Sequence, residues 1–238
     1  RRRPRVLQEE RPAPQDVTAP RVSVVIPARN EDGRLGACLE SLSGQSFADF
    51  ELVVVDDASS DGTADILARH RDPRTVRIRN AVKRGIAASR NIGLSRARGA
   101  FVFFTDADCL ADRDWIAAGL DRFTPRTAGL SGLTHYVAPG FRPSVRDRVR
   151  TTTLLRANPL VDPGHPHVLS TFMCCNAAYR RGALDRVGGF NEEYGNVMED
   201  FDLYLRVRAS LRGRPDAELA DCPAMVVRHQ RELYTVRS

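Results

Sequence analysis

The sequence has little of several features that mark particular protein classes. None of its apolar runs approaches the roughly 20 residues that a membrane-spanning helix needs, and no positively charged start followed by an apolar block indicates a secretory signal. Aromatic residues make up only 7% of the chain, and one of them is tryptophan. We therefore expect a cytoplasmic protein whose membrane contact is at most peripheral, at the inner face.

The five cysteines lack the spacing of a metal-binding motif. Cys174 and Cys175 are adjacent, which is a poor geometry for a disulfide between them. An odd number of cysteines with no evident pairing pattern is typical of a reducing compartment.

Lysine is nearly absent: Lys83 is the one lysine among 36 Lys and Arg residues, and the net charge is +6. Part of the positive excess lies in residues 1–20, which also contain four prolines and few apolar side chains. This composition predicts a disordered basic tail or linker. No aromatic residues alternate with these arginines, as stacking on bases would require, so we expect no nucleic-acid partner.

From Arg21 onward, continuous apolar runs alternate with amphipathic segments. The runs predict strands at 21–27, 50–57, 75–80, 100–104, 128–137, 167–179 and 218–229. The amphipathic segments predict helices at 31–45, 59–70, 85–99, 180–190 and 198–211. Continuous strands separated by helices predict an α/β fold with a mostly parallel central sheet and helices on both faces. We expect one domain over 21–230, followed by a tail over 231–238, with no internal repeat.

Polar groups follow three of the predicted strands. They are the segments 27–30 (PARN), 56–57 (DD) and 106–108 (DAD). Because ligands of parallel sheets bind beyond the carboxyl ends of the strands, we expect these groups to meet on one rim. Asp106 and Asp108 repel each other unless a cation or hydrogen-bond donors hold them. The alternative is an ordinary strand-end turn, in which Asp is common.

Four blocks carry a resemblance to the family 2 glycosyltransferases, which have the GT-A fold: VSVVIPARNE, ELVVVDDASSDGT, FFTDADC and GGFNEEYGNVMEDFDLYLR. The resemblance extends from about Arg21 to His229. It implies transfer of a sugar, with inversion, from a nucleotide-diphosphate donor to an acceptor hydroxyl or amine. A UDP-sugar is the commonest donor in the family. The acceptor would be a glycan, a lipid-linked glycan or a small-molecule aglycone, and the 140–170 loop would help to select it.

The resemblance also implies a set of donor-binding residues. They are Pro27, Arg29, Glu31, Asp57, Arg84, Arg90 and Asp106. Asp57 would accept a hydrogen bond from the base or the ribose. Arg84 and Arg90 would lie near the donor phosphates.

A divalent cation is the cofactor that the resemblance implies. Asp106 and Asp108 would form the DxD pair that handles the metal-bound diphosphate, with Asp108 as the more direct ligand. His229 would supply a further ligand, although an exposed surface histidine is an equally good interpretation. Mg²⁺ or Mn²⁺ suits such oxygen ligands, because both prefer carboxylates, phosphates and water.

The block around MED is the implied catalytic segment. Asp200 would be the general base, which takes the proton that the acceptor loses as it attacks. Asn176 and Glu199 would contact the acceptor or the donor sugar. The alternative for the acids is that they simply stabilise a helix N-terminus.

Processive members of the family carry a Gln-x-x-Arg-Trp motif after the base, and HQRELYTVRS contains none, so we expect one sugar per encounter.

Two alternative functions remain open. A catalytically inactive sugar-nucleotide-binding module would keep the same residues. A sugar-nucleotide pyrophosphorylase would need a glycine-rich loop after the first strand, where this chain has PARNEDGR. A dinucleotide oxidoreductase is not supported, because Gly-x-Gly-x-x-Gly is missing at that turn.

Overall fold

The computed structural model describes residues 19–136, 173–194, 198–214 and 216–230. The predicted tails, apart from Ala19 and Pro20, lie outside the described residues. So does the whole of the 140–170 loop to which acceptor selection was assigned.

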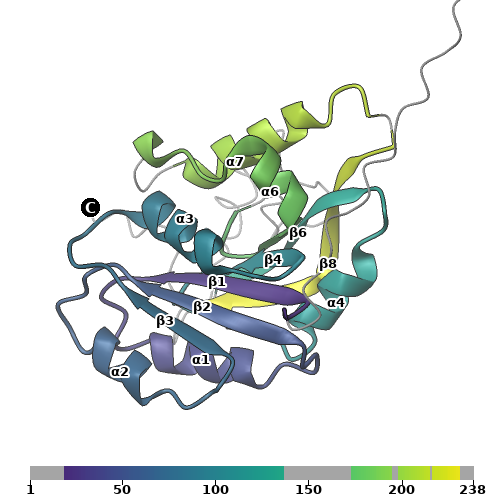
Figure 1. Ribbon diagram of the computed structural model, residues 1–238. Helices are drawn as coiled ribbons and strands as arrows, with labels where there is room; N and C mark the ends of the chain where they lie inside the picture. Colours follow the sequence, from purple (N-terminus) through teal and green to yellow (C-terminus); the bar gives the residue numbers. More distant parts are fainter. Residues whose placement is uncertain (1–18, 137–172, 195–197, 215, 231–238) are drawn as a thin grey trace, which may run out of the picture.

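A sheet in the strand order β3-β2-β1-β4-β7-β6-β8-β5 forms the middle of the molecule (Figure 1). Its strands are β1 (Val22–Ala28), β2 (Phe50–Asp56), β3 (Thr75–Arg79), β4 (Phe101–Phe104), β5 (Cys109–Ala111), β6 (Thr127–Tyr136), β7 (Ala177–Arg180) and β8 (Glu218–His229). The pairs β1–β2, β1–β4, β2–β3 and β6–β8 are parallel, and the pairs β4–β7, β6–β7 and β5–β8 are antiparallel. The predicted mostly parallel sheet is confirmed.

The strand β1 lies between β2 and β4, and it pairs in parallel with both. The chain therefore leaves β1 toward one side of the sheet and returns later to the other side. Connections that diverge in this way leave a crevice at the carboxyl ends of the strands, which is where open α/β sheets bind ligands.

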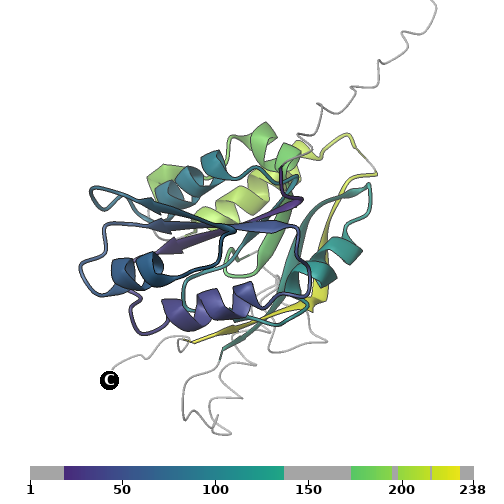
Figure 2. The ribbon, with the colours of Figure 1, turned by 60° about the horizontal axis from the view of Figure 1, so that its bottom comes forward.

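Helices cover both faces of the sheet, as predicted (Figures 1 and 2). One face carries α1 (Leu35–Ser43), α2 (Thr63–Arg69) and α4 (Trp115–Arg122), and the other carries α3 (Ile86–Arg96), α6 (Arg181–Val187) and α7 (Glu199–Ser210). Neighbouring residues of β1 serve the two cores in turn: Val24 packs in the cluster of Leu39 from α1, and Val25 packs in the cluster of Leu203 from α7. This burial on both faces explains why the strand is apolar without alternation.

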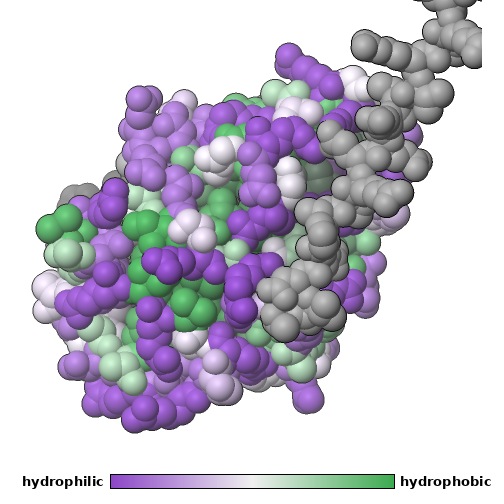
Figure 3. Space-filling view, in the orientation of Figure 1, coloured by the Kyte–Doolittle hydropathy of each residue, from purple (hydrophilic) through white to green (hydrophobic). Residues whose placement is uncertain are grey.

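The hydropathy of the surface also differs between the sheet and the helices. In the orientation of Figure 1, hydrophobic residues gather in the middle of the visible face, over the strands, and hydrophilic residues prevail on the helices above and below (Figure 3). Among the described helices, none has both the length and the apolar character that crossing a bilayer requires. The five cysteines are buried free thiols.

Two details of the predicted element order were wrong. The strand predicted over 167–179 begins only at Ala177 in its described part, because a turn closed by the hydrogen bond from Asn176 N–H to Met173 O (2.9 Å) precedes it. The sequence reading also missed β5 and α4. The short β5 gives too little pattern to detect, whereas the buried residues Trp115, Ile116, Gly119 and Leu120 of α4 have a helical spacing that could have been found.

Candidate active site

A cavity of about 370 Å³ opens at the rim formed by the carboxyl ends of β1, β2 and β4. The residues that line it are Pro27, Ala28, Arg29, Glu31, Asp57, Lys83, Ile86, Ser89, Asp106, Ala107, Asp108 and His229. All three polar segments that follow the predicted strands therefore contribute to one cavity, as expected from parallel strands. Lys83, Ile86 and Ser89 belong to the loop before α3 and its first turn, and the sequence reading did not assign them to the site.

Asp57 lies at the end of β2, where three donors hold its carboxylate. Asn80 Nδ2 and the Arg84 N–H donate to Oδ1, each at 2.8 Å, and the Gly85 N–H donates to Oδ2 at 2.9 Å. Burial raises the pKa of Asp57, but these hydrogen bonds outweigh it and hold the pKa below its usual value. The carboxylate is thus ionised and fixed at one wall of the cavity.

Arg29 and Arg84 take part in this wall in different ways. The Arg29 guanidinium donates to the backbone oxygens of Asp57 and Ala58, so it braces the turn after β2. Ala58 has φ 54°, a left-handed backbone that is strained for alanine. Arg84 reaches Asp57 through its backbone, and its side chain is exposed outside the cavity lining.

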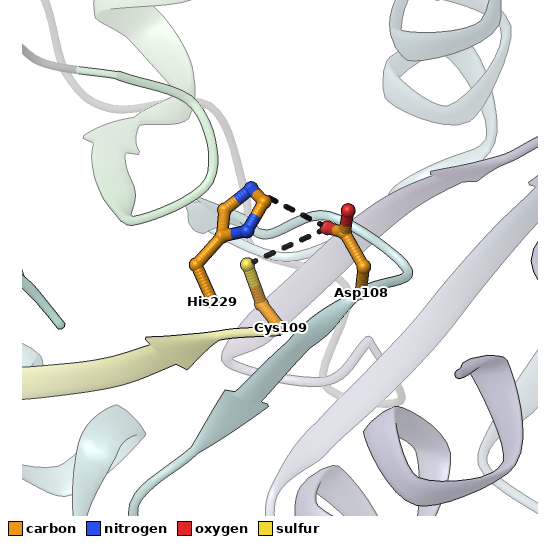
Figure 4. A group of neighbouring side chains, drawn as sticks. All are labelled: Asp108, Cys109 and His229. Atoms are coloured by element: carbon orange, nitrogen blue, oxygen red, sulfur yellow. Dashed lines mark hydrogen bonds and ion pairs between the residues drawn. The ribbon is translucent and has the colours of Figure 1, made fainter. Parts of the chain in front are cut away.

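The acidic turn after β4 places its two carboxylates in different surroundings. Asp106 Oδ1 accepts a hydrogen bond from Arg90 Nη2 at 2.8 Å. Asp108 is 6% exposed, and its Oδ1 lies 3.6 Å from His229 Nε2 (Figure 4). The antiparallel pairing of β5 with β8 sets Cys109 opposite His229, and this register brings the imidazole to the turn.

Side chains of Asp108, Cys109 and His229 bring their ligand atoms within 4.8 Å of one another (Figure 4). A hydrogen bond with Cys175, together with burial, raises the pKa of the Cys109 thiol well above its usual value. A protonated thiol is a poor ligand. The carboxylates of Asp106 and Asp108 and the imidazole of His229, all on one cavity, are a donor set that fits a hard divalent cation.

The predicted catalytic segment begins α7, directly after Met198, whose left-handed backbone (φ 68°) turns the chain into the helix. Glu199 is 5% exposed and accepts a hydrogen bond from Arg90 Nη1 at 2.6 Å. Asp200 is partly exposed, and its Oδ2 accepts a hydrogen bond from the Cys174 N–H at 3.3 Å. Neither acid lines the cavity described above.

Two further predicted site residues are buried away from the cavity lining. Arg90 is 2% exposed and bonds to both Asp106 and Glu199. Burial lowers the pKa of Arg90, but nearby negative groups, Asp106 foremost, raise it above its usual value, so the guanidinium stays charged. Asn176, which was expected to contact a sugar, is 1% exposed and bonds to Trp115, Leu133 and Met225.

Comparison with known proteins agrees with this geometry. The family model described as "Glycosyl transferase family 2" matches residues 23–188. The chain therefore belongs to glycosyltransferase family 2, and it is a glycosyltransferase with the GT-A fold.

Two curated relatives match most of the chain. Putative glycosyltransferase EpsE of Bacillus subtilis (strain 168) is 32% identical over 198 residues, which are 79% of this chain and 67% of EpsE. The glucosyltransferase WfaP of Escherichia coli, named as UDP-Glc:alpha-D-GlcNAc-diphosphoundecaprenol beta-1,3-glucosyltransferase, is 27% identical over 187 residues, 78% of this chain and 69% of WfaP.

Solved structures give the same class. Mannosyltransferase PcManGT from Pyrobaculum calidifontis, in complex with GDP-Man and Mn²⁺, superposes with a TM-score of 0.66 and 26% identity over 94% of this chain and 60% of that chain. S. aureus TarS 1-349 in complex with UDP-GlcNAc superposes with a TM-score of 0.65 over 90% of this chain and 59% of that chain, and at 20% identity it supports the fold alone.

Proposed function

We propose that this protein transfers one sugar per encounter, with inversion, from a nucleotide-diphosphate sugar to an acceptor hydroxyl or amine, and that the reaction depends on Mg²⁺ or Mn²⁺. The observation that carries the proposal is the cavity at the carboxyl ends of β1, β2 and β4, which unites Asp57, Asp106, Asp108 and His229. A site with a fixed anion at one end and a cation-binding set at the other suits a nucleoside diphosphate.

The two ends of the cavity have different tasks. Asp57, held ionised by its three donors, would face the nucleoside, and Pro27, Arg29 and Glu31, which line the same cavity, would border it. Asp106, Asp108 and His229 would hold the divalent cation. When bound, the cation would offset the negative charge that develops on the diphosphate leaving group.

Asp200 is proposed as the general base. Its carboxylate is partly exposed at the first turn of α7, and its Oδ2 accepts a hydrogen bond from the Cys174 N–H at 3.3 Å. An ionised carboxylate can accept the acceptor's proton as the new glycosidic bond forms. Glu199 is a weaker candidate, because it is buried and bonded to Arg90.

Substrates are proposed from the relatives. A UDP-sugar is the first donor to test, because the name of WfaP specifies UDP-Glc, and a GDP-sugar is the second, because PcManGT was solved with GDP-Man. The diphosphoundecaprenol acceptor in the name of WfaP favours a lipid-linked acceptor. A cytoplasmic setting at the inner face of a membrane goes with that proposal.

A donor screen tests the proposal directly. UDP-, GDP- and dTDP-sugars would be compared for thermal stabilisation of the protein with Mn²⁺, and the best donor would then be used in a transfer assay. We expect one nucleotide class to stabilise the protein, excess EDTA to abolish transfer, and added Mg²⁺ or Mn²⁺ to restore it.

Three other results would contradict the proposal. Full transfer activity in excess EDTA would contradict the proposed dependence on a divalent metal. Donor binding without turnover toward any acceptor or water would indicate an inactive binding module. Formation of a nucleoside triphosphate from the sugar nucleotide and pyrophosphate would indicate a pyrophosphorylase.

A further inference from the structure

Arg90 connects two parts of the candidate site that are far apart in the sequence. Its Nη2 donates to Asp106 Oδ1 at 2.8 Å, and its Nη1 donates to Glu199 Oε1 at 2.6 Å. Asp106 belongs to the acidic turn after β4, and Glu199 is the first residue of α7. A single guanidinium therefore spans the distance from the proposed cation-binding turn to the helix that carries Asp200.

Arg90 is itself held firmly by its surroundings. It lies in the middle of α3, 2% exposed, with its guanidinium carbon 5.6 Å from the centre of the Phe190 ring. The next residue, Asn91, donates to Phe190 O at 2.9 Å and accepts from the Phe190 N–H at 2.8 Å. The same turn of α3 thus fixes both the guanidinium and the chain that leads into α7.

The guanidinium is a planar, rigid fork, so its two arms cannot move independently. Through this fork, a displacement of Asp106 would also act on Glu199. Neither arm can be released cheaply, because a buried charge that loses one partner is poorly solvated. Asp200 follows Glu199 directly on the helix, so it moves with it.

We propose that Arg90 is a positioning residue that couples occupancy of the Asp106 turn to the placement of Asp200. The proposal rests on the function proposed above, in which Asp106 serves the cation and the diphosphate. It differs from the sequence-based expectation that Arg90 lies near the phosphates, because both of its terminal nitrogens are bonded to carboxylates and it does not line the cavity. It also makes Glu199 a support of the base helix rather than a contact of the sugar.

The test is a double-mutant cycle on ligand binding. Asp106→Asn, Glu199→Gln and the double variant would be titrated with Mn²⁺ and UDP, or with Mn²⁺ and GDP if GDP is the nucleotide that stabilises the wild type. Glu199→Gln should weaken binding at least about threefold although Glu199 does not line the cavity. In the Asp106→Asn background the same change should have little further effect, because Arg90 then has no charged partner on the turn.

The matched control is Glu51→Gln. Glu51 is another buried glutamate that pairs with an arginine next to α3, Arg98, at 2.9 Å, but it lies near the start of β2, away from the cavity rim. The Glu51→Gln substitution should lower the melting temperature without changing the affinity for Mn²⁺ and nucleotide. A purely structural role of Glu199 would give that same result and would overturn the proposal.

Turnover gives a second readout. At saturating donor, Glu199→Gln should lower kcat because Asp200 loses its support. In an Arg90→Met background, the fold-changes in affinity caused by Asp106→Asn and by Glu199→Gln should multiply in the double variant, because the residue that couples them is gone. The cycle with Arg90 intact decides the question if Arg90→Met fails to fold. If the wild type binds Mn²⁺ and nucleotide but the two substitutions have multiplicative effects with Arg90 intact, the coupling alone is overturned. If the wild type binds neither UDP nor GDP with Mn²⁺, the proposed function is contradicted as well.

Discussion

His229 Nε2 lies 3.6 Å from Asp108 Oδ1, although the two residues are far apart in the sequence. The contact comes from strand pairing: β5 and β8 run antiparallel with Cys109 opposite His229, and the Gln230 N–H donates to Asp108 O at 2.8 Å. The imidazole therefore reaches the acidic turn through the register of two strands and not through a local motif.

Replacing His229 by Gln should weaken Mn²⁺ binding in the presence of nucleotide. Loss of a residue that supports a metal site typically lowers metal affinity by about 10- to 100-fold, and we expect an effect of that size. Mn²⁺ titration followed by the nucleotide-dependent shift in melting temperature measures it. His70→Gln, at the end of α2, is the control and should leave the Mn²⁺ affinity unchanged. Wild-type Mn²⁺ affinity in His229→Gln would mean that His229 is no ligand.

Replacing Asp200 by Asn should lower kcat by about 10² to 10⁴, the usual contribution of a general base. Donor affinity should change little, because Asp200 does not line the donor cavity. Steady-state transfer at saturating donor measures kcat, and titration measures the affinity. Asp202→Asn is a suitable control on the same turn, because Asp202 bonds to Arg206 at 2.7 Å. Should Asp202→Asn lose turnover while Asp200→Asn kept it, the base would be misassigned.

Asp57 should make the stability of the protein depend on pH. Its pKa is lowered in the folded state, so its stabilising contribution is complete above the unfolded pKa of about 3.9 and is lost as the pH falls through the lower folded pKa. Asp57→Asn should therefore reduce the free energy of unfolding by about 2 kcal/mol at pH 7, since hydrogen bonds to a charged group are weakened.

The pH profile of that difference is the decisive measurement. Urea denaturation of wild type and Asp57→Asn at pH 7, 5, 4 and 3 should show the difference constant down to about pH 5 and shrinking below about pH 4. The exposed Asp65 on α2 provides the control, and Asp65→Asn should give a small difference at neutral pH. A difference for Asp57→Asn that persisted undiminished at pH 3 would contradict this account.

Asn176 should act on stability and not on the donor. Its Oδ1 accepts from Trp115 Nε1 at 2.8 Å, and its Nδ2 donates to Leu133 O and Met225 O, each at 2.9 Å. Asn176→Ala removes the side-chain partner of three buried or partly buried groups, each at a cost of about 1–3 kcal/mol, so the melting temperature should fall by at least about 6 °C.

Binding of Mn²⁺ and nucleotide by the folded Asn176→Ala protein should be unchanged. Asn191→Ala is the control for both measurements, because the Asn191 side chain accepts a hydrogen bond from the exposed Glu193 N–H. An unchanged melting temperature with a raised KM for the sugar nucleotide would instead support the original expectation that Asn176 contacts the sugar.

Much of the first half of the fold follows from local sequence. The run from Val22 to Ala28 is buried throughout and is apolar apart from Ser23, because helices cover both faces of β1, and charged residues start where the strand leaves the core. The parallel arrangement of three such strands then brings Asp57, Asp106 and Asp108 to one rim. These features are local in sequence, so pattern and spacing were enough to predict them.

Contacts between distant segments depended on the tertiary structure. Nothing in the sequence near Arg90 indicates that its two arms hold Asp106 and Glu199. Nothing near Asn176 indicates its bonds to one helix and two strands. Such contacts depend on the packing of α3 against α7 and on the register of β8, which arise only when the whole core closes. The sequence therefore determined which types of residue lie at the rim. Packing decided which of them face the cavity and which support the cavity wall from behind.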